Sequence, residues 1–187
     1  MQNISNYRQV IDNISRELGR YLDEHPKLES LVLGLSGGID SAATAALASR
    51  VCQEKGIKLI GRSITISSNK PGEIARASGI GEHFTDDFRL VDLSDRLEAV
   101  AATAMEDYQE ADRNSMAFKI RLGNVKARMR MLYLYDQASK NRGMLLSTDN
   151  YSELLLGFWT LHGDVGDFGM LQNLWKSEVY QIAAKLA

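Results

Sequence analysis

The chain has 187 residues, a length that suits one α/β domain with a sizeable hydrophobic core. Hydrophobic residues make up 44% of the sequence and charged residues 25%, with a formal net charge of -2. This balance is that of an ordinary soluble globular protein, and it excludes binding to nucleic acid through bulk positive charge. Because Cys52 is the only cysteine, the chain has neither a disulfide framework nor a CxxC metal site. Its position in a predicted helix favours a packed thiol over a reactive one.

The chain shows no targeting or membrane signal. Its first residues lack a basic segment followed by an apolar run, and no stretch approaches the length of a membrane span. With two prolines, no low-complexity tract and no internal repeat, one domain over residues 1–187 is the simplest organisation. We therefore expect a cytoplasmic protein with neither membrane nor nucleic acid among its partners.

The first third of the chain alternates helical and strand patterns. Residues 4–24 carry apolar residues at helical spacing, and residues 31–35 form the short apolar run typical of a buried parallel strand. A glycine turn and an alanine-rich helix over about 41–54 follow, with Gly56 expected just beyond the end of that helix. Residues 57–66 predict the second strand.

The middle of the chain continues the alternation. Pro71 is expected to open the third helix, because proline is favoured at the first helical position. Residues 88–93 predict the third strand, and Ser94 is expected to cap a helix that runs to about Tyr108.

The last third holds a long helix and a further strand. Residues 115–140 predict this helix, whose expected buried stripe includes Val125, Met129 and Leu132. Residues 144–148 predict the fourth strand, and shorter helices are expected around 152–157 and from Lys176 onward.

Strands and helices that alternate in this way predict an α/β fold, an open parallel sheet with helices on both faces. Ligands in such sheets bind at the carboxyl ends of the strands. Three segments leave predicted strands at that edge, namely 36–41, 67–70 and 148–153. We expect one site built from these segments.

The segment Ser36-Gly37-Gly38-Ile39-Asp40-Ser41 carries the clearest chemistry. Its glycines let the backbone turn sharply, and its hydroxyls, loop amides and helix N-terminus offer donors to a phosphate. Asp40 would repel a bare phosphate, so its presence indicates a Mg²⁺ ion between carboxylate and phosphate. The segment lacks the Gly-Lys-Ser/Thr of a Walker A loop and the Gly-x-Gly-x-x-Gly of dinucleotide folds. A plain strand-to-helix turn is the alternative interpretation.

This hexapeptide resembles the pyrophosphate loop of the N-type ATP pyrophosphatases, whose fold is Rossmann-like. Those enzymes adenylate an oxygen of their substrate, release pyrophosphate and let a nucleophile displace AMP. Three later segments resemble the NAD synthetases of the NH3-dependent type within that group. The first segment is Gly123-Asn124-Val125-Lys126-Ala127-Arg128. The second is Ser147-Thr148-Asp149-Asn150-Tyr151-Ser152-Glu153, in which Ser147 stands in place of a glycine. The third is Gly157-Phe158-Trp159-Thr160-Leu161-His162-Gly163-Asp164.

The resemblance implies ATP-dependent amidation of deamido-NAD to NAD by ammonia, with AMP and pyrophosphate released, in a homodimer. It implies a Mg²⁺ ion held by Asp40 and Glu153, ATP contacts from Thr148 and Lys176, and catalytic roles for Asp164 and Lys176. Asp164 would orient ammonia, and Arg128 and Asp167 would face deamido-NAD. ATP would also contact the loop, which comprises Gly34, Leu35, Ser36, Gly37, Gly38, Ile39, Asp40 and Ser41.

Each of these residues has a simpler interpretation when taken alone. Arg128 on an amphipathic helix can be a solvated side chain, Glu153 a first-turn carboxylate, and Asp164 and Asp167 turn residues. His162, beside a tryptophan, is expected to be packed and not catalytic.

Besides Ser147, the match departs from the family at Leu161, in a loop after Gly163 that is one residue shorter than in some members, and at the end of the chain. Leu161 stands where many ammonia-dependent members carry a lysine, and members of the family continue beyond residue 187. The alternatives are therefore another synthetase with the same loop and a degenerate nucleotide-binding module.

Overall fold

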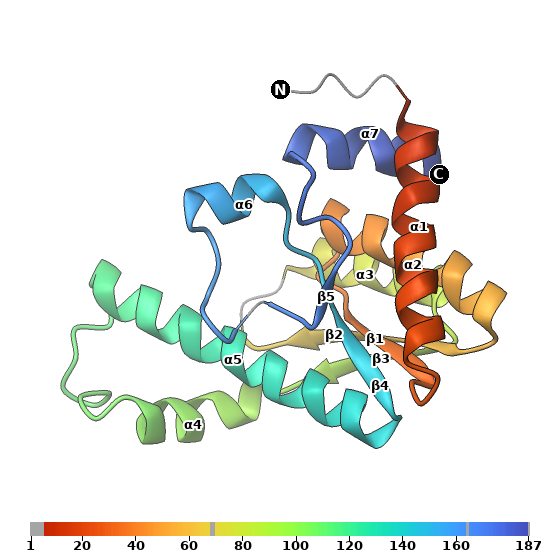
Figure 1. Cartoon of the computed structure of the whole chain (residues 1–187). Helices are drawn as coiled ribbons and strands as arrows, with labels where there is room; N and C mark the ends of the chain where they lie inside the picture. The colour runs from red at the N-terminus through yellow and green to blue at the C-terminus, as the bar shows by residue number, and fades with distance from the viewer. Residues whose placement is uncertain (1–5, 68–69, 164, 187) are drawn as a thin grey trace.

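A computed structural model describes residues 6–67, 70–163 and 165–186, and it has the predicted open parallel sheet with helices on both faces (Figure 1). The strands pair in the order β3-β2-β1-β4-β5, and every pairing is parallel. Their bounds are β1 Ser30–Gly34, β2 Lys58–Thr65, β3 Asp87–Asp92, β4 Gly143–Ser147 and β5 Phe168–Gly169.

The helices divide between the two faces of the sheet. One face is covered by α1 (Tyr7–Glu24), α2 (Ile39–Lys55), α3 (Pro71–Phe84) and α7 (Lys176–Leu186). The other face is covered by α4 (Leu97–Ala104) and the long α5 (Met116–Lys140), with a short 3-10 turn, η1 (Ser94–Arg96), before α4. The short helix α6 (Tyr151–Leu156) follows β4.

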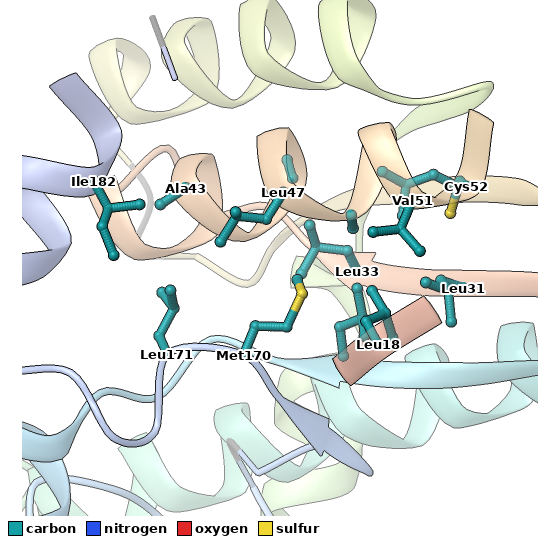
Figure 2. Packing of buried hydrophobic residues seen from close by; sticks show 14 of the residues in the cluster. Leu18, Leu31, Leu33, Ala43, Leu47, Val51, Cys52, Met170, Leu171 and Ile182 are labelled. Carbon is teal, nitrogen blue, oxygen red and sulfur yellow. The ribbon is translucent and has the colours of Figure 1, made fainter. Parts of the chain in front are cut away.

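Each buried strand contributes side chains to the hydrophobic cores on both faces of the sheet, because successive side chains of a strand point to opposite faces. Leu31 and Leu33 of β1 pack with the α1, α2 and α7 side, and Val32 between them packs with the α5 side. Figure 2 shows the first core, where Leu47 of α2 lies near Leu33 of β1 and Ile182 of α7 lies beside Ala43 of α2. The central strands are therefore fixed from both sides.

The strand order places a crevice beside β1. From β1 the chain moves through α2 to β2 and then to β3 on one side, and it returns later to β4 on the other side. The connections after β1 and β4 leave neighbouring strands, which is the arrangement that opens a ligand crevice at the carboxyl edge.

Several local predictions are confirmed. Gly56 ends α2 in the left-handed conformation at φ 67, and Pro71 is the first residue of α3. Cys52 is buried at 1% exposure, and burial, followed by the charge of Asp86, raises the pKa of its thiol to about 12.

Within the described ranges, no helix is long and apolar enough to cross a membrane.

Two local predictions were wrong. Ser94 does not cap a helix to Tyr108, because its hydroxyl accepts the amide of Ser67 at 2.8 Å and α4 begins later, at Leu97, and ends at Ala104. Leu132 is 76% exposed although Val125 and Met129 are buried.

The buried side of α5 changes along its length, and this change explains Leu132. One buried side carries Phe118, Val125 and Met129, and the other carries Ala127, Met131, Leu134 and Ala138, most of them later in the helix. At about 100° per residue these two sets lie on opposite sides of the helix. Leu132 lies on the first side but beyond Met129, where the buried residues belong to the second side, so it is exposed.

Candidate functional site

The glycine loop after β1 is folded tightly against α3. Gly37 has φ 79, and a Cβ atom there would lie 2.3 Å from the carbonyl oxygen of Glu73. Arg76 Nε donates to the carbonyl oxygen of Gly37 at 3.0 Å. Only glycine combines this backbone conformation with this close approach, so the sequence of the loop dictates its path.

The two serines of the loop hold it from inside. The Ser41 hydroxyl donates to the carbonyl of Gly38 at 3.0 Å, and the Gly38 amide donates to Ser36 Oγ at 3.2 Å. Gly38 is the N-cap of α2 and supplies no side-chain cap to the first amides of the helix. These amides and the positive end of the helix dipole are suited to bind a phosphate.

The segment after β4 reaches the loop through Asn150, which is completely buried. Asn150 and Glu153 form a capping box at the start of α6, with Glu153 N donating to Asn150 Oδ1 at 3.1 Å. The amide of the same Asn150 donates to Asp40 Oδ1 at 3.0 Å. A single side chain thus links Asp40 to the element that carries Glu153.

Lys176, the first residue of α7, completes this cluster. Its ammonium group donates to Asp40 Oδ2 and lies 3.6 Å from Glu153 Oε1, and its backbone amide donates to Ser152 Oγ at 3.0 Å. Burial by itself lowers the pKa of Lys176, but the hydrogen bond and charge of Asp40, followed by Glu153, raise it above the ordinary value. Three segments distant in the sequence therefore meet at one cation.

Asp40 and Glu153 of this cluster line one of three cavities that share lining residues. The phosphate cavity, about 270 Å³, is lined by Ser36, Asp40, Ser41, Thr148, Asp149, Glu153 and Phe158. A second cavity of about 330 Å³, called the nucleoside cavity after the ligand proposed for it below, shares Ser36 and Thr148 with the first and adds Gly34, Leu35, the buried Arg62 and Arg130. Two of the polar side chains are thus common to both cavities.

The third cavity, the apolar cavity, has a volume of about 550 Å³. Trp159, Leu161 and Leu154 contribute apolar surface, and Asp149 is shared with the phosphate cavity. His162 also lines it and is exposed with φ 58, so the prediction that His162 is packed was wrong. A turn in the left-handed region holds this side chain at the surface.

Asp40 and Glu153 fit the requirement for a shared cation. Both carboxylates converge on the single ammonium of Lys176, so they are close enough to hold one positive charge together. Among the described residues, no group of three or more His, Cys, Asp or Glu side chains can enclose a metal ion. Two carboxylates suit Mg²⁺, which usually keeps waters and phosphate oxygens as its other ligands.

Two predicted residues lie apart from the phosphate cavity. Arg128 is exposed on α5, and its Nε donates to the carbonyl of Leu161 at 3.3 Å. Asp167 accepts the amide of Leu145 at 3.1 Å and the hydroxyl of Tyr135 at 3.0 Å, beside the middle of β4. Asp164 lies outside the described residues.

Sequence reasoning missed the roles of Asn150 and Arg62. Asn150 stands in an Asn-x-x-Glu pattern that indicates a helix start, but its contact with Asp40 needs the fold. Arg62, 2% exposed, donates to the carbonyls of Gly61 and Asp87 and to Asp87 Oδ2 at 2.8 Å. A charged residue inside a buried strand carries no sequence signal of its partner.

Comparison with known proteins gives a family and several relatives. The family model described as NAD synthase matches residues 10–187. The NH(3)-dependent NAD(+) synthetase of Methanocaldococcus jannaschii is 31% identical over 176 residues, which cover 94% of this chain and 64% of that protein. This chain therefore spans less than two thirds of the length of that relative.

Solved structures give the same picture of the fold. An NMN synthetase from Francisella tularensis has a TM-score of 0.84 at 27% identity and covers 97% of this chain and 71% of its own. An NH3-dependent NAD synthetase from Campylobacter jejuni, solved with the nitrate ion, has a TM-score of 0.82 at 26% identity and covers 97% and 73%.

Proposed function

The chain belongs to the NAD synthase family, and on this premise we propose that it catalyses the ATP-dependent amidation of deamido-NAD to NAD. Ammonia is the proposed nitrogen donor, as it is for the relatives named NH3-dependent synthetases. The enzyme is then a carbon-nitrogen ligase that forms AMP and pyrophosphate. We further propose that residues 1–187 are one ATP-pyrophosphatase domain.

The convergence of Asp40, Glu153 and Lys176 beside the glycine loop carries this proposal. The loop offers backbone donors to phosphate oxygens, while the two carboxylates offer a place for the cation that accompanies ATP. Plain strand-to-helix turns do not need two carboxylates from distant segments around one ammonium group. A bound nucleotide with its cation would use both the backbone donors of the loop and the two carboxylates.

ATP is proposed to span the phosphate cavity and the nucleoside cavity. Ser36 and Thr148 line both cavities, so they mark where phosphates give way to the nucleoside. Gly34 to Ser41 contact the phosphates and ribose, and Arg62 and Arg130 line the far part of the nucleoside cavity. The nucleotide then lies over the carboxyl ends of β1 and β4.

The chemistry follows from these positions. A carboxylate oxygen of the nicotinate group attacks the α-phosphorus, and pyrophosphate leaves with the electron pair of the broken bond. Lys176 turns from Asp40 toward the departing pyrophosphate and offsets its charge. Mg²⁺ held by Asp40 and Glu153 would supply further charge neutralisation to the phosphates when bound. Ammonia then displaces AMP from the acyl-adenylate.

The apolar cavity is proposed to take the nicotinate ring, with Trp159 offering an aromatic surface. Arg128 and Asp167 remain proposed contacts of deamido-NAD, and Asp164 remains the proposed residue that orients ammonia. Asp167 acts on the cavity through Tyr135, which lines it and donates to Asp167. Burial, followed by Asp167, raises the pKa of that tyrosine, so it stays a hydrogen-bond donor.

A homodimer in the cytoplasm is the proposed state of the protein. Large apolar side chains are exposed on and after α6, where Leu156 is 80% exposed and Phe158 is 79% exposed. Leu132 of α5 adds a further exposed apolar side chain. Apolar surface of this extent is typical of a region that another chain covers.

Pyrophosphate release tests the proposed function. With ATP, Mg²⁺ and ammonium present, deamido-NAD should stimulate release, and nicotinic acid mononucleotide is the competing acceptor because one structural relative is an NMN synthetase. Asp40→Asn should lower the rate at least about 100-fold with the fold intact by circular dichroism. Asp12→Asn on the exposed side of α1 is the matched control. Failure of deamido-NAD to stimulate release would refute the proposal.

A further inference from the structure

Asp149 belongs to the walls of two cavities. It lines the phosphate cavity together with Thr148 and Glu153, and it lines the apolar cavity together with Trp159 and Leu161. Asp149 is therefore a charged side chain at the junction where a phosphate-bearing ligand and an apolar ligand meet.

The carboxylate of Asp149 is held in place by Ser147. Ser147 is the last residue of β4, 1% exposed, and its Cα is paired with that of Gly169 in β5. Its hydroxyl donates to Asp149 Oδ2. A buried donor on a rigid strand thus fixes one oxygen of the carboxylate, and such pre-positioning is what a catalytic group requires.

The charge of Asp149 is unfavourable for the acyl substrate alone. If the nicotinate ring lies in the apolar cavity and the α-phosphate in the phosphate cavity, the substrate carboxylate lies near Asp149. Two carboxylates at an apolar wall repel each other unless a cation lies between them. Ammonium is a cation of suitable size, and it is also the proposed nitrogen source.

We propose that Asp149 binds the ammonium ion and accepts its proton, an inference that rests on the function proposed above. The Asp149 carboxylate takes one proton from ammonium, and the freed lone pair of ammonia forms a bond to the acyl carbon. The bond between that carbon and the phosphate oxygen breaks, and its electron pair leaves with AMP. The second proton, from the newly bound nitrogen, passes to water.

The other described ionisable side chains around the two cavities each line one cavity only, and Asp164, proposed above to orient ammonia, lies outside the described residues. Asp40 and Glu153 line the phosphate cavity only and share the ammonium of Lys176. Tyr135 and His162 line the apolar cavity only, and His162 is exposed. Among the described residues that line these cavities, Asp149 is the carboxylate that reaches both.

The test separates adenylation from amidation in the full chain. Deamido-NAD-dependent exchange of pyrophosphate into ATP, measured without ammonium, reports adenylation. Asp149→Asn keeps the size of the side chain and an acceptor for Ser147, and it removes the charge that repels the substrate carboxylate, so this exchange should be equal or faster. Its kcat/KM for ammonium should fall about 100-fold, the range of general-base catalysis. Asp12→Asn is the control and should change neither rate.

Hydroxylamine gives the second arm of the test. At neutral pH it is an uncharged nucleophile that needs neither a counter-ion nor prior loss of a proton. With hydroxylamine, Asp149→Asn should lose less than about 5-fold in kcat/KM. Ser147→Ala should also lose more kcat/KM for ammonium than for hydroxylamine, but by a smaller factor than Asp149→Asn. The role of Asp149 would be overturned if kcat/KM fell equally with both nucleophiles. It would also be overturned if the variant needed a different concentration of Mg²⁺ and the same concentration of ammonium. Absence of exchange in the unsubstituted chain would instead refute the proposed function.

Discussion

Replacement of Lys176 by methionine tests whether Asp40 and Glu153 form one cation site. Methionine keeps an unbranched apolar stem of similar length and removes the charge. In the structure, Lys176 donates to Asp40 Oδ2 and lies 3.6 Å from Glu153 Oε1. The variant therefore leaves two converging carboxylates without their shared positive charge.

The expected loss of stability is small, because the Lys176 side chain is 37% exposed. A unit charge pair at 3.6 Å is worth about 1 kcal/mol in a water-like environment, so the two contacts together contribute about 1–2 kcal/mol. For a chain of this size that loss corresponds to a fall in Tm of about 2–8 °C. Because the folded-state pKa of Lys176 is raised, this stabilisation is present below the ordinary pKa of lysine and is lost as pH rises through the raised value.

Differential scanning fluorimetry with and without millimolar Mg²⁺ is the assay. Mg²⁺ should raise the Tm of Lys176→Met by several degrees and should change that of the unsubstituted chain little, because Lys176 already occupies the site. Lys55→Met is the matched control, since Lys55 pairs with the single exposed Asp23. A Lys176→Met variant that is as stable as the unsubstituted chain and no more responsive to Mg²⁺ would refute the shared site.

Three further predictions concern the frame of the site. Gly37→Ala should destabilise the fold by about 2–4 kcal/mol in urea denaturation, since φ is 79 and the added Cβ meets a carbonyl, whereas Gly123→Ala on the open side of α5 should stabilise it by about 0.5–1 kcal/mol. Asp87→Ala should cost about 2 kcal/mol and more than Arg62→Met, because it leaves a buried guanidinium without its counter-charge; the reverse order would contradict this reasoning. Cys52 should resist alkylation at neutral pH until the protein unfolds, and stability should fall as pH rises from about 9 toward 12, since a raised thiol pKa favours the folded state only below that range.

The order of the main elements was predictable because their signals are local. Gly56 supplies the left-handed residue at the end of α2, and Pro71 supplies the fixed φ at the start of α3. The two-residue β5 was not predicted, because strands of that length carry no periodicity. Ser94 was assigned wrongly because its hydroxyl finds a partner in Ser67, which is 27 residues away in the chain.

The site was predictable where a motif marks it and not where the fold alone creates a contact. Asp40, Glu153 and Lys176 were named from the resemblance, and the structure brings them together. Asn150 was missed because it acts through Asp40, a tertiary neighbour, and the place of Asp149 between two cavities was not predictable either. Which cavities share a wall depends on side-chain packing that no local pattern encodes.

If this chain joins ammonia to the carboxyl group of deamido-NAD at the expense of ATP, as proposed, the nitrogen of ammonium must appear in NAD. Incubation with ATP, Mg²⁺, deamido-NAD and isotopically heavy ammonium, followed by mass spectrometry, measures this directly. We expect NAD that carries the heavy nitrogen, together with equal amounts of AMP and pyrophosphate. ATP consumption without labelled NAD, or release of ADP and phosphate in place of AMP and pyrophosphate, would contradict it.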